Sequence, residues 1–187
     1  ITAVAGSLGS SAQVDISLSC ANPVLDIKLP NSVAFARVLT GSKFLAQVLV
    51  TNGSGGPVVA GLTNSHFLAE VNGVSAPVTG GGFIQEQYWL VIEAPSLSDG
   101  TYNLAVTLQD PDSGSDLATD TSPSSVFYTT ELTDQAIVID RSGSMGVGTP
   151  TRLSAAKDAA SFYVDVTRDG DGLAVVPYND EVDPAPF

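Results

Sequence analysis

Apolar and polar residues alternate along several short stretches of the first 130 residues. The segments VDISLSC (14–20), LDIKL (25–29), FLAQVLV (44–50) and TYNLAVTLQ (101–109) place apolar side chains at every second position. Successive side chains of a β-strand point to opposite faces, so this period predicts strands with one buried and one solvated face. Turn signals such as Asn-Gly and Gly-Gly-Gly separate the segments. The pattern therefore predicts a mainly β chain that begins with an antiparallel β-sandwich.

The pattern changes after Glu131. The segment AIVI (136–139) is apolar on both faces, which is typical of a central strand in a parallel sheet that is covered on both sides. A helix is expected next, with Thr149 as its N-cap and Pro150 as its first residue. The segment GLAVV (172–176) then supplies another apolar strand. A strand, a helix and a strand in this order predict a βαβ unit with parallel strands.

Charge and composition exclude several classes of function. The 187 residues carry a formal net charge of -13, whereas binding to nucleic acid phosphates requires a basic surface. Most of this charge, -11, lies from Asp99 onward. No apolar run approaches the roughly 20 residues that a membrane helix needs, so no membrane span is expected. The single cysteine, Cys20, excludes an internal disulfide.

A candidate metal site follows the AIVI strand directly. In DRSGSMG (140–146), the oxygen-bearing side chains of Asp140, Ser142 and Ser144 stand at alternate positions. A nearly extended loop brings alternate side chains to one side, and oxygen atoms are the ligands that Mg²⁺ and Ca²⁺ prefer. Because two of the three ligands are neutral hydroxyls, a bound ion keeps positive charge that attracts a further carboxylate. The spacing predicts a Mg²⁺ or Ca²⁺ site.

The order strand, D-x-S-x-S, helix, strand resembles the N-terminal part of a von Willebrand factor A domain. In that family the residues at the positions of Asp140, Ser142 and Ser144 begin the metal-ion-dependent adhesion site. The resemblance implies an α/β unit of Rossmann-like type and a partner protein whose Asp or Glu is the last metal ligand. It also implies that the later metal residues, a threonine and an aspartate, lie beyond Phe187. The unit is then incomplete, and its apolar faces are exposed unless the remainder of the domain or a neighbouring subunit covers them.

Residues 55–108 resemble the immunoglobulin-like modules of bacterial surface proteins, in which a D-G-x-Y step leads into a late strand, as Asp99 to Tyr102 does here. The resemblance implies that Tyr102 bonds its hydroxyl to nearby backbone, as a tyrosine corner does; an ordinary core tyrosine is the alternative. The expected organisation is an N-terminal arm or strand (1–22), an immunoglobulin-like β-sandwich (23–130) and the N-terminal portion of a von Willebrand factor A-like domain (131–187).

These features indicate a non-enzymatic adhesion or protein-interaction module outside the cell or on its surface. No nucleophile has a base within sequence reach, so no enzyme activity is expected. One alternative is a structural spacer or a subunit of a surface layer, stalk or filament, with no functional metal. Another is the accessory region of a secreted metalloprotease-like protein, because the two modules together also resemble calcium-activated chloride channel regulator proteins. The acidic segment DPDSGSDLATD (110–120) is expected to be a solvated loop rather than a Ca²⁺ site.

Overall fold

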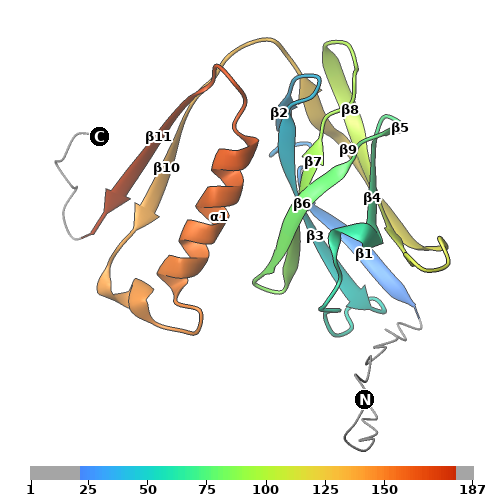
Figure 1. The fold of residues 1–187 in the computed structure, drawn as a ribbon, viewed down its shortest axis with the longest axis horizontal. Coiled ribbons are helices and arrows are strands. Elements are labelled where there is room, and N and C mark those ends of the chain that lie inside the picture. Colours follow the sequence, from blue (N-terminus) through green and yellow to red (C-terminus); the bar gives the residue numbers. More distant parts are fainter. Residues whose placement is uncertain (1–21, 180–187) are drawn as a thin grey trace, which may run out of the picture.

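The computed structural model describes residues 22–179, except for the side chain of Phe162. Two facing β-sheets form its larger part, here called the sandwich (Figure 1). Its strands are β1 (Pro23–Leu29), β2 (Ala36–Val38), β3 (Lys43–Asn52), β4 (Phe67–Val71), β5 (Val74–Ser75), β6 (Val78–Ile84), β7 (Gln87–Glu93), β8 (Gly100–Gln109) and β9 (Asp116–Tyr128), with a short 3-10 helix, η1 (Asn64–His66), before β4. The four-stranded sheet has the order β1-β3-β7-β6, and the five-stranded sheet β2-β9-β8-β4-β5. The mainly β prediction is confirmed; the predicted arm or strand at residues 1–22 lies, but for Asn22, outside the described residues.

One hydrophobic core lies between the two sheets. The inward residues of β3 are Phe44, Ala46, Val48 and Val50, and each exposes 3% of its surface or less. Leu104 in β8 belongs to the same cluster and is fully buried. Burying one such aliphatic side chain contributes about 1.5–3 kcal/mol to folding. The predicted alternation is therefore confirmed, and it supplies the main stabilising term of the sandwich.

The sequence pattern predicted an antiparallel sandwich, and this prediction is wrong for one pair of strands. Strand β2 pairs with β9 in parallel, with Ala36 beside Val126, whereas the other strand pairs of the sandwich are antiparallel. The chain crosses from the four-stranded to the five-stranded sheet between β1 and β2, so β2 meets β9 instead of returning along β1. A strand of three residues is too short to show a period, which is why the sequence did not reveal it.

Side chains of β9 bond to the backbone of β1 and join the two sheets at this edge. The Asp120 carboxylate accepts a 2.8 Å hydrogen bond from the Ile27 N–H. The Ser122 hydroxyl donates a 2.8 Å hydrogen bond to the Pro30 carbonyl. An edge strand otherwise presents unpaired backbone groups, so the Asp120 bond satisfies one N–H of β1, and the Ser122 bond fixes the chain directly after this strand.

Tyr102 makes the hydrogen bond that the resemblance to immunoglobulin-like modules implied. Its hydroxyl donates to the Ser98 carbonyl at 3.1 Å, four residues upstream. Its ring packs edge-on against Tyr128, with 5.4 Å between the ring centroids. Tyr128 donates in turn to the Pro95 carbonyl at 2.9 Å, and burial, together with the neighbouring Tyr102, raises the pKa of Tyr128 to about 12. The predicted backbone bond of Tyr102 is thus confirmed.

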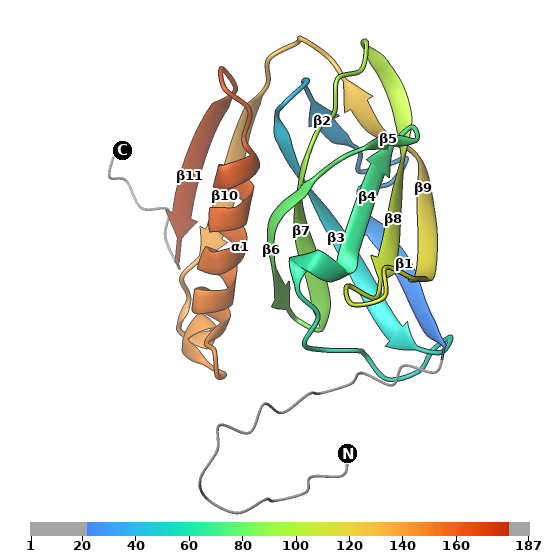
Figure 2. The same ribbon diagram turned by 45° about the vertical axis from the view of Figure 1, so that its right-hand side comes forward.

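The remaining elements form a second part, here called the C-terminal unit. It consists of β10 (Asp134–Asp140), a 3-10 helix η2 (Gly143–Gly146), α1 (Arg152–Val166) and β11 (Gly172–Tyr178). Strands β10 and β11 pair in parallel along their whole length, which confirms the predicted βαβ unit. Helix α1 stands between these strands and the four-stranded sheet (Figure 2) and contacts both β10 and β3.

The helix begins two residues later than the sequence predicted. Its N-cap is Thr151, whose side-chain oxygen accepts a 3.2 Å hydrogen bond from the Ser154 N–H. The predicted cap, Thr149, and Pro150 lie in the preceding turn. A cap must satisfy an N–H of the first helical turn, and Thr151 is the residue that does so.

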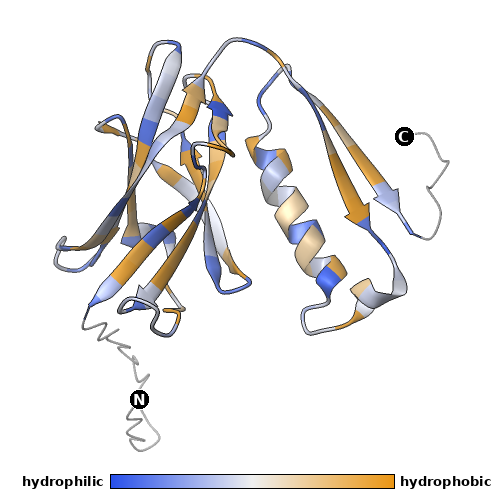
Figure 3. Cartoon of the chain, turned by 180° about the vertical axis from the view of Figure 1, so that it is seen from behind, coloured by the Kyte–Doolittle hydropathy of each residue, from blue (hydrophilic) through white to orange (hydrophobic). Residues whose placement is uncertain are grey.

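Strand β10 is covered on one face only, contrary to the expectation from its apolar sequence. Gln135 faces α1 and accepts a hydrogen bond from Tyr163, and Ile137 and Ile139, on the same side, are half-buried. On the opposite side Val138 is 61% exposed, and Figure 3 shows this strand as strongly hydrophobic. No element within residues 22–179 covers that face, so this apolar face of β10 is exposed in the described chain.

The connection between the two parts is held by a buried arginine. The Arg168 side chain, 4% exposed, donates to the carbonyls of Thr129 at 2.6 Å and of Glu131. It also forms an ion pair with Asp171 at 2.8 Å. The same Asp171 oxygen accepts a 2.9 Å bond from the Thr133 N–H. These four contacts, here called the Arg168 network, tie the end of α1 to the segment that enters β10.

The Arg168 network is expected to weaken in acid. Burial by itself would raise the pKa of Asp171, but the Thr133 N–H and the Arg168 guanidinium outweigh it and hold the pKa below the ordinary 3.8. A carboxyl with a lowered pKa contributes stability above its unfolded-state pKa and loses that contribution as pH falls through the folded-state value. Chemical unfolding at neutral pH and at several points below pH 3.8 should show the stability gap between wild type and Asp171→Asn closing in acid. A gap that is constant with pH would contradict this.

Candidate metal centre

The candidate metal residues lie where β10 ends and the chain turns toward α1. Pairing with β11 continues one residue past the strand, because the Arg141 N–H donates to the Tyr178 carbonyl at 2.7 Å. The chain then turns at Ser142, the N-cap of η2, whose carbonyl accepts a 2.9 Å bond from the Met145 N–H. The parallel sheet thus fixes the position of Asp140, and the short helix fixes those of the two serines.

The three predicted side chains point to one place. The Ser142 hydroxyl donates to Asp140 Oδ2 at 3.1 Å and lies 3.1 Å from the Ser144 hydroxyl. Asp140 Oδ1 accepts a 2.7 Å bond from the Ser142 N–H, so one carboxylate oxygen is held by backbone while the other faces the hydroxyls. Asp140 and Ser142 are half-buried and Ser144 is exposed. The three oxygens form a short row that is open to solvent at one end.

The spacing of this row suits a small divalent cation. Mg²⁺ binds oxygen at about 2.0–2.1 Å in octahedral geometry, which separates neighbouring ligands by about 3 Å. Both separations along the row are 3.1 Å, which is close to this ligand spacing. Ca²⁺, with ligands at about 2.3–2.6 Å, requires the oxygens to spread by a few tenths of an ångström. The remaining positions are open to water or to a partner.

The site has little negative charge for a divalent ion. Asp140 is its one carboxylate, and no group of three His, Cys, Asp or Glu residues suited to a metal occurs between residues 22 and 179. A bound ion would therefore keep about one positive charge, which favours an anionic further ligand. The first turn of α1 lies on the same side of the unit, where η2 contacts the helix, and the positive end of the helix dipole adds to this preference.

Carboxylates of the acidic segment at residues 110–120 are engaged in hydrogen bonds with different parts of the chain. Asp110 bonds within its own loop, to the Ser113 hydroxyl at 2.6 Å and the Asp112 N–H at 3.1 Å. These bonds, that from Ser113 foremost, lower the pKa of Asp110. Asp120 is engaged with the backbone of β1. The prediction of a solvated loop is confirmed for residues 110–115, whereas residues 116–120 belong to strand β9, so that part of the prediction is wrong.

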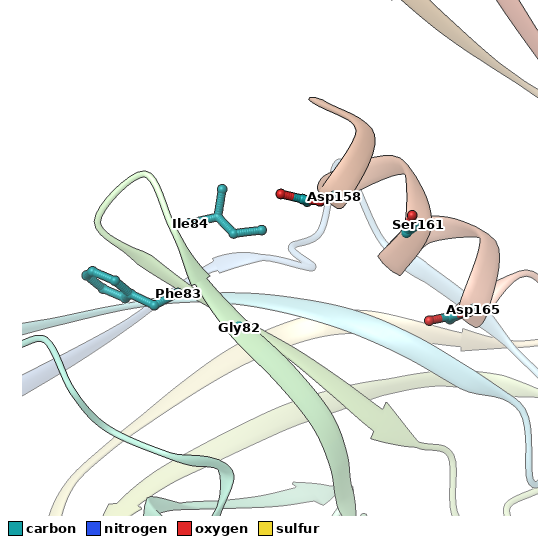
Figure 4. A pocket seen from close by; sticks show the side chains of 6 residues that line it. All are labelled: Gly82, Phe83, Ile84, Asp158, Ser161 and Asp165. Atoms are coloured by element: carbon teal, nitrogen blue, oxygen red, sulfur yellow. The ribbon is translucent and has the colours of Figure 1, made fainter. Parts of the chain in front are cut away.

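Two hollows flank α1, and the sequence pattern predicted neither. One, of about 400 Å³, lies between the helix and β6. Figure 4 shows Asp158 and Asp165 directed from the helix toward the β6–β7 hairpin, where Phe83 and Ile84 stand. The other, of about 640 Å³, lies between α1, the entry to β10 and the four-stranded sheet. It is here called the interface groove. Its walls come from distant parts of the chain, so only the folded topology brings them together.

Helices within the described part of the chain are too short or too polar to cross a membrane. Comparisons of the chain with protein families, with curated proteins and with solved structures found no match.

Proposed function

We propose that this protein is a non-enzymatic adhesion or protein-interaction module that works outside the cell or on its surface. In this proposal Asp140, Ser142 and Ser144 hold Mg²⁺ or Ca²⁺, and a partner protein supplies an Asp or Glu carboxylate as a further ligand. In this proposal the sandwich is an immunoglobulin-like module that presents the N-terminal portion of a von Willebrand factor A-like unit. The ion binds at the end of β10, the first strand of that unit.

The observation that carries the proposal is the convergence of three side-chain oxygens at ligand-like spacing. Such a row is not required by the turn itself, because the hydrogen bond from the Ser142 N–H to Asp140 already stabilises the turn. The Ser144 hydroxyl, exposed and 3.1 Å from that of Ser142, adds nothing to the buried core. A metal ion gives all three oxygens a common role.

Replacing Asp140 by alanine is expected to abolish the binding of Mg²⁺. The substitution removes the one carboxylate of the site and leaves two neutral hydroxyls, which do not hold a divalent cation alone. Calorimetric titration of wild type with MgCl₂ and with CaCl₂ should give saturable heat of one-to-one stoichiometry. The Asp140→Ala variant should give only heat of dilution.

Asp134→Ala is the matched control, since Asp134 is an exposed aspartate at the other end of the same strand. It should bind Mg²⁺ as wild type does. Equal heats from Asp140→Ala and wild type would contradict the proposal, as would a loss shared by both variants. Circular dichroism of each variant, compared with wild type, separates a lost ion from a lost fold.

A structural role is the second candidate, and the uncovered face of β10 and β11 favours it. Val138 exposes 61% of its surface there, beside its half-buried partner Val176 on β11, and an apolar sheet face of this kind tends to pack against another protein surface. A spacer or filament subunit would keep its assembly when EDTA removes every divalent ion. Sedimentation with and without EDTA therefore separates this candidate from metal-dependent contact.

A further inference from the structure

The interface groove has the size and position of a ligand site. About 640 Å³ of space separates the outer face of the four-stranded sheet from the last turn of α1. Binding sites of about 300–1,000 Å³ are common at junctions between folded parts. The sandwich contributes Phe35 and Trp89 to its walls, and the C-terminal unit contributes Gln135 and Tyr163.

Three aromatic rings lie around the groove without being fully packed. Phe35 is 46% exposed and Tyr163 38% exposed, and Trp89 is half-buried. The rings stand on both walls, since Phe35 and Trp89 belong to the sandwich and Tyr163 to α1. Large aromatic side chains that keep part of their surface in water are the usual anchors of protein interfaces. The groove is therefore suited to an apolar, preferably aromatic, side chain from a partner.

The groove is lined by both cations and anions, the anions being Asp134 and Asp171. Three of the seven Lys and Arg residues of the chain, Arg37, Lys43 and Arg168, line it. Arg168 is neutralised by Asp171, and Arg37 lies 3.7 Å from the mostly exposed Glu131 carboxylate. Lys43 is exposed and forms no ion pair within residues 22–179, although Glu93 is its cross-strand partner. At least one cation is thus free to meet a carboxylate from outside.

We propose that the interface groove binds a peptide segment of a partner protein in which an aromatic residue is flanked by acidic ones. The aromatic side chain packs among Phe35, Trp89 and Tyr163, and a flanking carboxylate pairs with Lys43. Asp134 and Gln135 on the opposite wall accept hydrogen bonds from the N–H groups of the peptide. The acidic surface elsewhere on the protein repels such a segment, so binding is confined to the groove. This site is separate from the metal centre and does not depend on it.

The test uses three blocked tripeptides and the natural fluorescence of the protein. Trp89 is the only tryptophan of the chain and lines the groove, so its emission reports occupancy directly. Acetyl-Glu-Phe-Glu-amide should change the emission saturably. Acetyl-Lys-Phe-Lys-amide and acetyl-Glu-Ala-Glu-amide should change it weakly or not at all, because one has the wrong charge and the other lacks the ring.

Lys43→Glu should lower the affinity for acetyl-Glu-Phe-Glu-amide by about five- to tenfold, since the substitution replaces an attraction with a repulsion. Lys157→Glu makes the same change in charge on an exposed part of α1 outside the groove and should leave the affinity within about twofold. Asp140→Ala should bind the peptide as wild type does, which distinguishes this site from the metal centre. The absence of any response to Glu-Phe-Glu, equal binding of the Lys and Glu peptides, or equal weakening by the two lysine variants would overturn the proposal.

Discussion

Arg168→Ala is expected to destabilise the C-terminal unit by about 3–5 kcal/mol, the range found when one partner of a buried ion pair is removed. The substitution leaves the Asp171 carboxylate, whose side chain is 6% exposed, without its counter-charge. It also leaves the carbonyls of Thr129 and Glu131 without their donor. The unit has little else to resist this loss, because no residue of α1 whose side chain is described is fully buried.

The helical circular-dichroism signal during urea unfolding measures this effect, since α1 is the one α-helix within residues 22–179. Arg152→Ala serves as the control: Arg152 lies in the first turn of the same helix and is exposed, so its loss should cost less than about 0.5 kcal/mol. Arg168→Lys should fall between the two, because lysine keeps the charge but cannot reach two carbonyls and a carboxylate with a planar fork. If Arg168→Ala and Arg152→Ala unfold alike, the network is not stabilising.

The partners of Arg168 in the Arg168 network could not be predicted from the sequence. In RDGDG (168–172) an arginine stands beside two aspartates and two glycines, which is the composition of a solvated turn. The turn is present, with the Asp171 N–H bonded to the Arg168 carbonyl at 3.0 Å. What the local sequence does not contain is the segment 129–133, some forty residues away, whose backbone fills the space around the guanidinium. Such long-range backbone partners are brought to Arg168 by the topology of the fold, and they produce no periodic pattern in the sequence.

The same division applies to the candidate sites. Asp140, Ser142 and Ser144 are predictable as neighbours because they are close in sequence, but the expected nearly extended loop is wrong: Ser142 caps η2 and Ser144 lies within it, so a 3-10 turn brings their oxygens together. The strands β3 and β8 are predictable because the alternation is long. The interface groove is not predictable, since Phe35, Trp89 and Tyr163 belong to separate elements. The exposed face of β10 is predictable only in part. The sequence shows that its residues are apolar, but it does not show whether another element covers them.

Leu104→Ala is expected to destabilise the sandwich by about 2–5 kcal/mol, the cost of removing a buried leucine and leaving a cavity. Leu104 is fully buried and lies in β8, which pairs with β9 on one side and β4 on the other. Both neighbours restrict the backbone, so the sheet cannot move inward to fill the space. Denaturant unfolding followed by Trp89 fluorescence reports the loss, because Trp89 stands on β7 of the opposite sheet.

Leu68→Ala removes the same atoms from β4, where the side chain is 46% exposed, and should cost less than about 1 kcal/mol. The contrast between the two leucines tests whether the alternation along each strand, rather than its overall hydrophobicity, stabilises the sandwich. Equal destabilisation by both variants would mean that the two faces of the five-stranded sheet contribute alike. A loss confined to Leu104→Ala would show that the facing sheets form one cooperative core, on which the groove wall at Trp89 and the position of α1 depend.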